Sequence, residues 1–313
     1  MSNKNEVTKK IKHIAKEMGF HLVFITEAKP PTYFSSYLQW IEKNYHGEME
    51  YLKRHVEKKA DPKHVLSSAK SIICCGVSYK TSFHNPLQAQ KGHALISNYA
   101  WGDDYHLVIE KMLIKLLNKI KELIPEVEAK YYVDTGPLLE RNFAAMAGLG
   151  WIGKNTCLIN QTYGSYIFLS ELLVNIELEE DFPELDHCGT CMKCLESCPT
   201  GAFVAPYQLD AKKCISYLTI EKRGEFNLEE KGMIGDHLFG CDICQQVCPW
   251  NDKSETPDMA CFRPREKNFH PDLESFSKIT EGDFHSRFQK SPMKRTKYEG
   301  FKRNFNVVWR SEV

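Results

Sequence analysis

The chain contains CGTCMKCLESCP at residues 188–199 and CDICQQVCP at residues 241–249, and these two stretches decide how it is interpreted. The first run has cysteines at positions 188, 191, 194 and 198, and the second at positions 241, 244 and 248. Proline follows the last cysteine of each run, and Cys214 stands alone between the runs. Repeated two-residue gaps between cysteines predict thiolates that bind a metal group.

The spacing is that of a bacterial ferredoxin with two [4Fe–4S] clusters. Two-residue gaps in a tight turn bring three sulfurs to one cluster, and the fourth cysteine of the run points to the other. We therefore assign Cys188, Cys191, Cys194 and Cys248 to one cluster, and Cys198, Cys214, Cys241 and Cys244 to the second. Structural zinc is the alternative for Cys-x-x-Cys pairs, but the Cys-Pro endings disfavour it. Disulfides are disfavoured because the chain lacks a secretory signal.

Length and charge set broad limits on the function. The 313 residues predict about two domains. The 41 Lys and Arg residues balance 41 Asp and Glu residues, so the net charge indicates no general affinity for nucleic acid. The first residues lack an apolar signal core, and no apolar run approaches the ~18 residues of a membrane helix, so we expect a soluble, cytoplasmic protein without a membrane partner. Residues 287–310 carry eight basic residues and one acid, which indicates either a phosphate-binding surface or a solvated helix face.

Hydrophobic periodicity predicts a mixed α/β or α+β domain at residues 1–178. Helical patterns cover residues 7–18, 103–124 and 138–147, and strand patterns cover residues 22–25, 72–77, 131–133, 156–159 and 165–174. Residues 179–255 form the predicted ferredoxin module. Residues 256–313 form a short, helical, basic tail.

Several polar residues fall at the junctions between these elements. Asp134 follows a strand and precedes a helix, so it is either a helix cap or a general acid at the mouth of a pocket. Residues 148–153 match the dinucleotide fingerprint, but they follow a helix rather than a strand, so we interpret them as a loop that lets some other large ligand approach. Tyr105 and His106 are expected in the core, and Cys157 has no predicted catalytic role.

Taken together, these segments resemble epoxyqueuosine reductase over nearly the whole chain. The resemblance is carried by Trp-Gly-x-Asp-Tyr-His at 101–106, Val-Asp-Thr-Gly at 133–136, Gly-x-Gly-x-x-x-Lys-Asn at 148–155, Tyr-Gly-Ser-Tyr at 163–166 and the two cysteine runs. It implies reduction of the epoxide of epoxyqueuosine in the tRNA anticodon loop to queuosine, with loss of water, by cob(I)alamin that the two [4Fe–4S] clusters supply with electrons. It also implies a cobalamin-binding domain like that of reductive dehalogenases, with a central sheet flanked by helices.

The resemblance further assigns roles to individual residues. Asp134 is the expected proton donor, which requires a raised pKa. The expected cobalamin-binding residues are Lys59, Ser97, Asp134, Lys154, Asn155, Ser216 and Asp242. Some relatives carry cysteine where this chain has Ser97, so Ser97 is expected only to contact the cofactor. The expected tRNA-binding residues are Lys222, Arg223, Lys294, Arg295, Lys302 and Arg303. The expected partners are tRNA carrying epoxyqueuosine and an external electron donor, with the protein acting as a monomer.

Other functions remain open on the residues alone. A cobalamin-dependent small-molecule reductase or reductive dehalogenase is one, and a reductive activator of another corrinoid protein is a second. A simple electron carrier is a third, although it leaves the first ~180 residues without a role.

Overall fold

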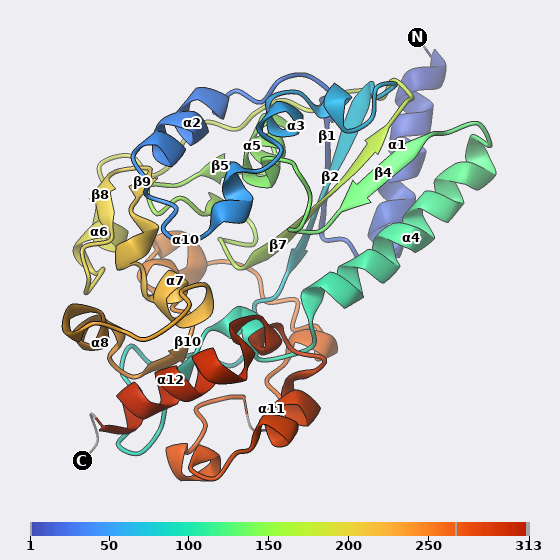
Figure 1. Cartoon of the computed structure of the whole chain (residues 1–313). Helices are drawn as coiled ribbons and strands as arrows, with labels where there is room; N and C mark the ends of the chain where they lie inside the picture. The colour runs from blue at the N-terminus through green and yellow to red at the C-terminus, as the bar shows by residue number, and fades with distance from the viewer. Residues whose placement is uncertain (1, 267, 311–313) are drawn as a thin grey trace.

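A four-stranded antiparallel sheet organises the N-terminal half of the protein (Figure 1). The computed structural model describes residues 2–266 and 268–310; residues 1, 267 and 311–313, which include the end of the predicted tail, lie outside that description. The strand order is β1-β2-β7-β4. The bounds are β1 (Leu22–Glu27), β2 (Ser71–Ser78), β7 (Ile167–Val174) and β4 (Ala129–Tyr132). Every residue of β2 is buried, as its continuous apolar run predicts.

Helices cover both faces of this sheet. Helices α1 (Ser2–Glu17) and α4 (Tyr105–Leu123) pack on one face, and α5 (Glu140–Met146) packs on the other. Successive strand residues point to opposite faces, which explains the two separate apolar layers. Asp104 caps α4, the helix expected at residues 103–124, by accepting the backbone N–H of His106. Pro125 follows the helix closely and prevents its extension.

The cysteine runs lie in a second unit of short elements. The unit contains α6 (Lys193–Glu196), β8 (Phe203–Ala205), β9 (Gln208–Leu209), α7 (Ile215–Ile220), α8 (Leu228–Ile234), β10 (His237–Phe239), α9 (Ile243–Gln246) and α10 (Pro249–Asp252). Elsewhere, α2 (Phe34–Glu42) and α3 (Val56–Ala60) join β1 to β2, while β3 (Leu95–Ile96) pairs with β10, and β5 (Trp151–Ile152) with β6 (Leu158–Ile159).

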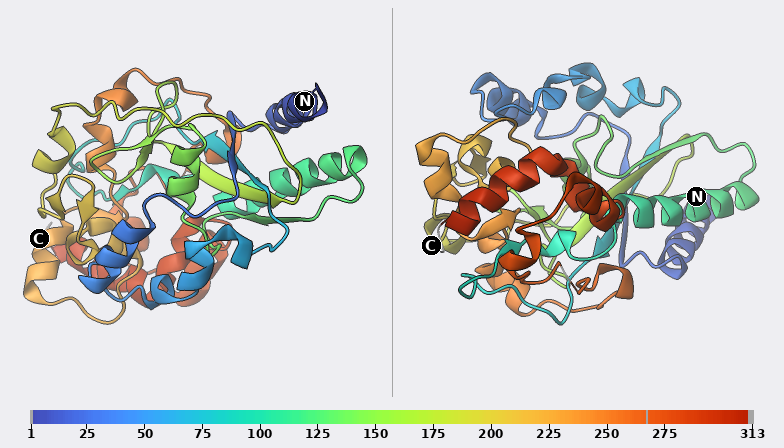
Figure 2. Two further views of the ribbon diagram at one scale, coloured as in Figure 1. Left: turned by 90° about the horizontal axis from the view of Figure 1, so that it is seen from above. Right: turned by 60° about the horizontal axis from the view of Figure 1, so that its bottom comes forward.

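The C-terminal residues pack on the cysteine unit and are not a detached tail. Figure 2 shows α12 (Lys297–Arg310) lying across this part of the molecule, with α11 (Glu281–Phe288) beside it. Phe301 and Phe305 of α12 share one apolar core with Leu218 of α7 and Phe239 of β10. The predicted third segment is therefore helical, as expected, but its apolar face completes the core of the second unit.

In the described part of the chain, no helix has the length and apolar character needed to span a membrane.

Candidate active site

The structure brings the cysteines together in two groups that match the spacing argument. Burial, together with the neighbouring thiols of Cys248 and Cys188, raises the pKa of Cys194 to about 11. Burial likewise raises the pKa of Cys248, with Cys188 and Cys191 among the groups that add to the effect. The last cysteine of the second run therefore lies beside the first three of the first run.

The remaining four cysteines form the second group. Burial raises the pKa of Cys241, and the thiols of Cys214 and Cys198 contribute to the same shift. Cys244 lies close enough to Cys214 and Cys241 for both thiols to raise its pKa as well. Cys157, to which the sequence assigned no role, shares a hydrogen bond with Cys244. The division of ligands between two clusters stays a prediction, and this geometry supports it.

Lys154 and Asn155 support the cysteine loops and do not line the cavity. The Lys154 ammonium donates to the carbonyls of Gly189 at 2.7 Å and Cys191 at 3.0 Å. The Asn155 amide donates to the carbonyl of Cys244 at 3.3 Å. Both side chains are buried. That they also lie beside the cofactor stays a prediction; in this arrangement the backbone carbonyls of the cysteine turns occupy their polar groups.

Ser97 and Asp242 are also buried behind the cavity wall. The Ser97 hydroxyl donates to Asp242 Oδ1 at 2.5 Å, and the backbone N–H of Asn98 donates to Oδ2 at 2.7 Å. These bonds join the β3 segment to the second cysteine run. Cobalamin binding by Ser97 and Asp242 stays a prediction, and in this structure their side chains bond to each other inside the protein.

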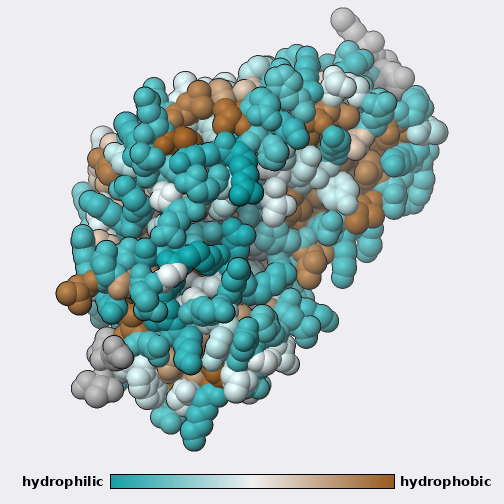
Figure 3. Space-filling model, viewed as in Figure 1, coloured by the Kyte–Doolittle hydropathy of each residue, from teal (hydrophilic) through white to brown (hydrophobic). Residues whose placement is uncertain are grey.

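A large cavity lies between the sheet domain and the cysteine unit. Its volume is about 2160 Å³, whereas sites for small ligands usually occupy roughly 300–1,000 Å³. Figure 3 shows mostly hydrophilic residues around the centre of this face, between the α2–α3 segment and α12. Asp134, Lys59 and Ser216 line the cavity as predicted, together with Cys214 of the second cysteine group. The Lys59 ammonium itself donates to the carbonyls of Leu52 and Arg54.

Asp134 projects into this cavity from a turn after β4. Its backbone has φ of +61°, a left-handed conformation that a non-glycine residue adopts at a cost. Its Oδ2 accepts the Tyr105 hydroxyl at 2.7 Å and lies 3.5 Å from His106 Nε2, while its backbone N–H donates to Glu140 Oε1 at 2.6 Å. The side chain is 59% exposed, and that exposed surface faces the cavity that it lines.

The expectation of a raised pKa for Asp134 is wrong. Burial acts to raise the pKa, but hydrogen bonds from His106 and Tyr105, with the charges of His106 and Arg295, outweigh burial and lower it. Because the groups around the carboxyl favour its charged form, Asp134 is ionised near neutral pH in this arrangement.

His106 is the group that holds a proton, and it was expected in the core. Its Nδ1 lies 2.8 Å from Asp104 Oδ1, so the imidazole stands between two carboxylates. Burial acts to lower the pKa of His106, but Asp104 and Asp134 together raise it to about 9. Lys294 approaches the other oxygen of Asp104 at 2.6 Å. The sequence feature that could have indicated this site is a histidine two residues after an aspartate, in Asp104-Tyr105-His106.

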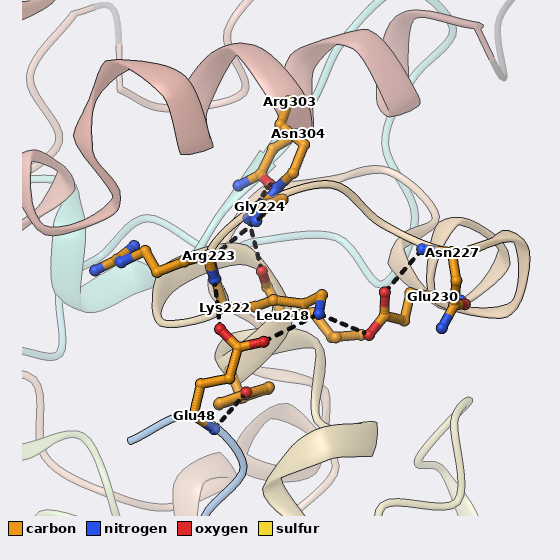
Figure 4. A network of polar contacts seen from close by, with 10 residues as sticks. Glu48, Leu218, Lys222, Arg223, Gly224, Asn227, Glu230, Arg303 and Asn304 are labelled. Carbon is orange, nitrogen blue, oxygen red and sulfur yellow. Dashed lines mark hydrogen bonds and ion pairs between the residues drawn. The ribbon is translucent and has the colours of Figure 1, made fainter. Parts of the chain in front are cut away.

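The predicted tRNA-binding residues divide into buried and accessible ones. The Arg303 guanidinium is buried and donates to the carbonyls of Leu218, Lys222 and Gly224 at 2.8–2.9 Å (Figure 4). Its contact with phosphate stays a prediction that this arrangement does not support, because these carbonyls occupy its donors.

The other predicted tRNA-binding residues have their own partners. Lys222 lies 3.2 Å from both Glu48 and Glu230, and the Arg223 side chain donates to the carbonyl of Ile220. Lys294 and Arg295 line the cavity, where Arg295 pairs with Glu221 at 2.9 Å. Lys302 is exposed.

Two family models match this chain. Residues 187–251 match the 4Fe-4S double cluster binding domain, and residues 59–135 match the model for epoxyqueuosine reductase QueG, DUF1730. The first match supports iron–sulfur clusters over zinc in the cysteine unit.

Curated relatives extend this similarity to the whole chain. The epoxyqueuosine reductase of Cellulophaga algicola is 42% identical over 98% of this chain and 100% of its own length. That of Escherichia coli is 38% identical over 89% of this chain and 76% of its own.

Solved structures agree with the relatives. An epoxyqueuosine reductase bound to an epoxyqueuosine-modified tRNA-Tyr stem loop superposes with a TM-score of 0.92 at 30% identity, covering 98% of this chain and 82% of the other. The enzyme of Bacillus subtilis was solved with its catalytic aspartate loop swung out of the active site. It superposes with a TM-score of 0.89 at 30% identity, covering 98% of this chain and 82% of the other. The chain therefore belongs to the epoxyqueuosine reductase family.

Proposed function

We propose that this protein reduces the epoxide of epoxyqueuosine in the anticodon loop of tRNA to the alkene of queuosine. The observation that carries the proposal is that Asp134 of the sheet domain and Cys214 of the cysteine unit line the same cavity. An acid–base group and a predicted cluster ligand thus face the same cavity. Family membership names the substrate class, and the cavity geometry supports the chemistry.

The reaction sets the requirements for the site. An epoxide, two electrons and two protons give an alkene and one water, so the site must deliver electrons singly from the clusters and also supply protons. A cobalamin bound in the cavity would supply a strongly reducing centre able to hold two electrons. The cavity fits such a group because its volume exceeds that of ordinary small-ligand sites and because Cys214 and Ser216 form part of its wall.

Asp134 serves as the proton donor in this proposal, and His106 keeps it supplied. The imidazolium lies 3.5 Å from the Asp134 carboxylate, so a proton can pass from His106 to Asp134 as negative charge develops on the epoxide oxygen. Tyr105 orients the carboxylate through its hydroxyl, and its ring is fixed by stacking on Phe168 at 4.2 Å. Asp104 keeps the imidazole charged and oriented.

The tRNA would approach the cavity mouth, where Lys294 and Arg295 lie. A modified base must leave its stack to reach Asp134, as in other enzymes that act on bases. Arg295, stacked over Tyr51 at 5.3 Å, is held by Glu221 in a position to meet a phosphate. The proposal also includes an external electron donor and a monomeric protein acting in the cytoplasm, where tRNA is found.

The test is turnover by the purified protein with both clusters and cobalamin restored. A stem loop carrying epoxyqueuosine is incubated with a chemical reductant, and the nucleosides are analysed by mass spectrometry. Conversion to queuosine, lost in Asp134→Asn with cluster and cobalamin absorbance intact, supports the proposal. Absence of queuosine from the fully loaded protein would show that the substrate is wrong.

A further inference from the structure

Glu171 is a buried carboxyl for which the mechanism above has no use. It lies in the middle of β7, where it is 0% exposed, and its neighbours Leu169 and Leu173 belong to the apolar layer beneath α5. Among the described residues, no N–H group and no hydroxyl, amide or ammonium side chain donates to either of its oxygens. An ionised carboxylate in such a position is very unfavourable, so the group must carry or share a proton.

Glu140 is the group with which that proton can be shared. It is the first residue of α5, and its carboxyl contacts that of Glu171. Two carboxyl groups form a hydrogen bond only if one of them is protonated, because an ionised carboxylate has no donor. Burial together with the nearby charge of Asp134 raises the pKa of Glu140 to about 8, and burial and Glu140 raise that of Glu171 well above its usual value.

Glu140 also holds the backbone of Asp134. Its Oε1 accepts the Asp134 N–H at 2.6 Å, at the residue whose φ is +61°. A strained backbone persists only where surrounding contacts fix it. The Glu140 carboxyl is thus a contact that fixes the turn, and its own position depends on the proton it shares with Glu171.

We propose that Glu140 and Glu171 share one proton, and that Glu140, held by this proton, is the positioning residue that keeps Asp134 directed toward Tyr105 and His106. The proposal rests on the proposed role of Asp134. When the shared proton is lost, two carboxylates face each other and repel, that of Glu171 in the buried layer and that of Glu140 at the cavity wall, and the repulsion displaces Glu140 and releases the turn. The other titratable groups that face the pair are Asp134, Arg141 and Tyr105 on the cavity side, Cys74 and Cys75 of β2, and Tyr132 of β4.

Infrared spectroscopy tests the shared proton without any assay of activity. The parent protein at neutral pH should show the carbonyl stretch of a buried protonated carboxyl, and Glu171→Gln should lose it. The matched control is Ser170→Ala, which alters the adjacent buried residue of β7, likewise without a hydrogen-bond partner for its side-chain oxygen. This control should keep the band. If the parent and Glu171→Gln give the same spectrum, the pair does not share a proton.

Turnover tests the positioning role. Glu140→Leu removes the acceptor for the Asp134 N–H and should lower kcat on the order of 10²-fold, with KM for the stem loop and cluster content little changed. In Glu171→Gln the amide donates to Glu140 at every pH. Its turnover should therefore match the parent at pH 7 and persist at the alkaline pH at which the pair in the parent loses its last proton and turnover of the parent declines.

The failures of the two proposals are distinguishable. Full turnover in Glu140→Leu, or an alkaline decline in turnover that is identical in Glu171→Gln and the parent, would overturn the positioning role. If the parent itself gives no queuosine, the proposed function fails, and the infrared band still decides whether the pair shares a proton.

Discussion

Replacing Lys154 by methionine distinguishes a structural role from a role in cofactor binding. The side chain is 9% exposed, and its ammonium donates to two carbonyls of the first cysteine run, at 2.7 and 3.0 Å. Hydrogen bonds from a charged donor contribute about 1.5–3 kcal/mol each. Water can reach this turn, because Gly189 is exposed and Cys191 is only half-buried, so we take the lower end for each and expect a loss of about 3 kcal/mol.

That loss acts on the loop that holds the first cluster. About 3 kcal/mol corresponds to roughly a hundredfold change in the equilibrium between the ordered and opened loop. Lys154→Met should therefore lose iron to a chelator about a hundredfold faster than the parent where opening limits release. Iron content and cluster absorbance followed over time give the rate. Lys193→Met, an exposed position in the same run, should behave like the parent.

Cobalamin binding is measured in parallel on the same samples. If Lys154→Met keeps its iron at the parent rate but binds cobalamin more weakly, the lysine contacts the cofactor, and the structural argument is refuted.

Three further predictions follow from the same contacts. Arg303→Met should lower the free energy of unfolding by about 3 kcal/mol, since the carbonyls of three residues lose their charged donor and that of Leu218 is buried. Lys302→Met should change the free energy of unfolding by under about 0.5 kcal/mol in urea titrations. The ion pairs of His106 raise its pKa from 6.5 to about 9. Their contribution to the free energy of unfolding is therefore complete below pH 6.5 and is lost as the pH rises through 9. The free energy of unfolding of His106→Gln should lack this pH dependence. Cys191→Ala should lose about half of the iron, whereas Cys157→Ala should retain it, and equal iron contents would contradict the ligand assignment.

The sequence predicted the positions of the main elements well because burial leaves a clear pattern. β2 was indicated by an uninterrupted apolar run, and α4 by its apolar spacing and its cap at Asp104. The grouping of the cysteines followed from their spacing, since short gaps restrict how far a thiol can reach. The pairing of β7 with both β2 and β4 could not be predicted, because it joins segments far apart in the chain.

The roles of individual polar residues were harder to predict. Lys154 and Arg303 both lie in stretches rich in polar groups, and both turn their charge onto backbone carbonyls. Such a partner has no signature in the sequence, because every residue carries a carbonyl. The pKa of Asp134 was predicted with the wrong sign for a related reason. Burial was considered, but the imidazolium of His106, brought to it from the start of α4, was not.

The C-terminal segment takes part in the proposed active site even though no catalytic role was predicted for it. Lys294 contacts Asp104, Asp104 contacts His106, and His106 contacts Asp134, so one line of charges runs from this segment to the turn after β4. Its core side chains meanwhile share an apolar core with α7, the helix that follows Cys214. The segment therefore links the proton-supplying side of the cavity to the wall that carries a predicted cluster ligand. A deletion after the second cysteine run would remove Lys294 and expose that core, so the sheet domain and the cysteine unit are not expected to form the site on their own.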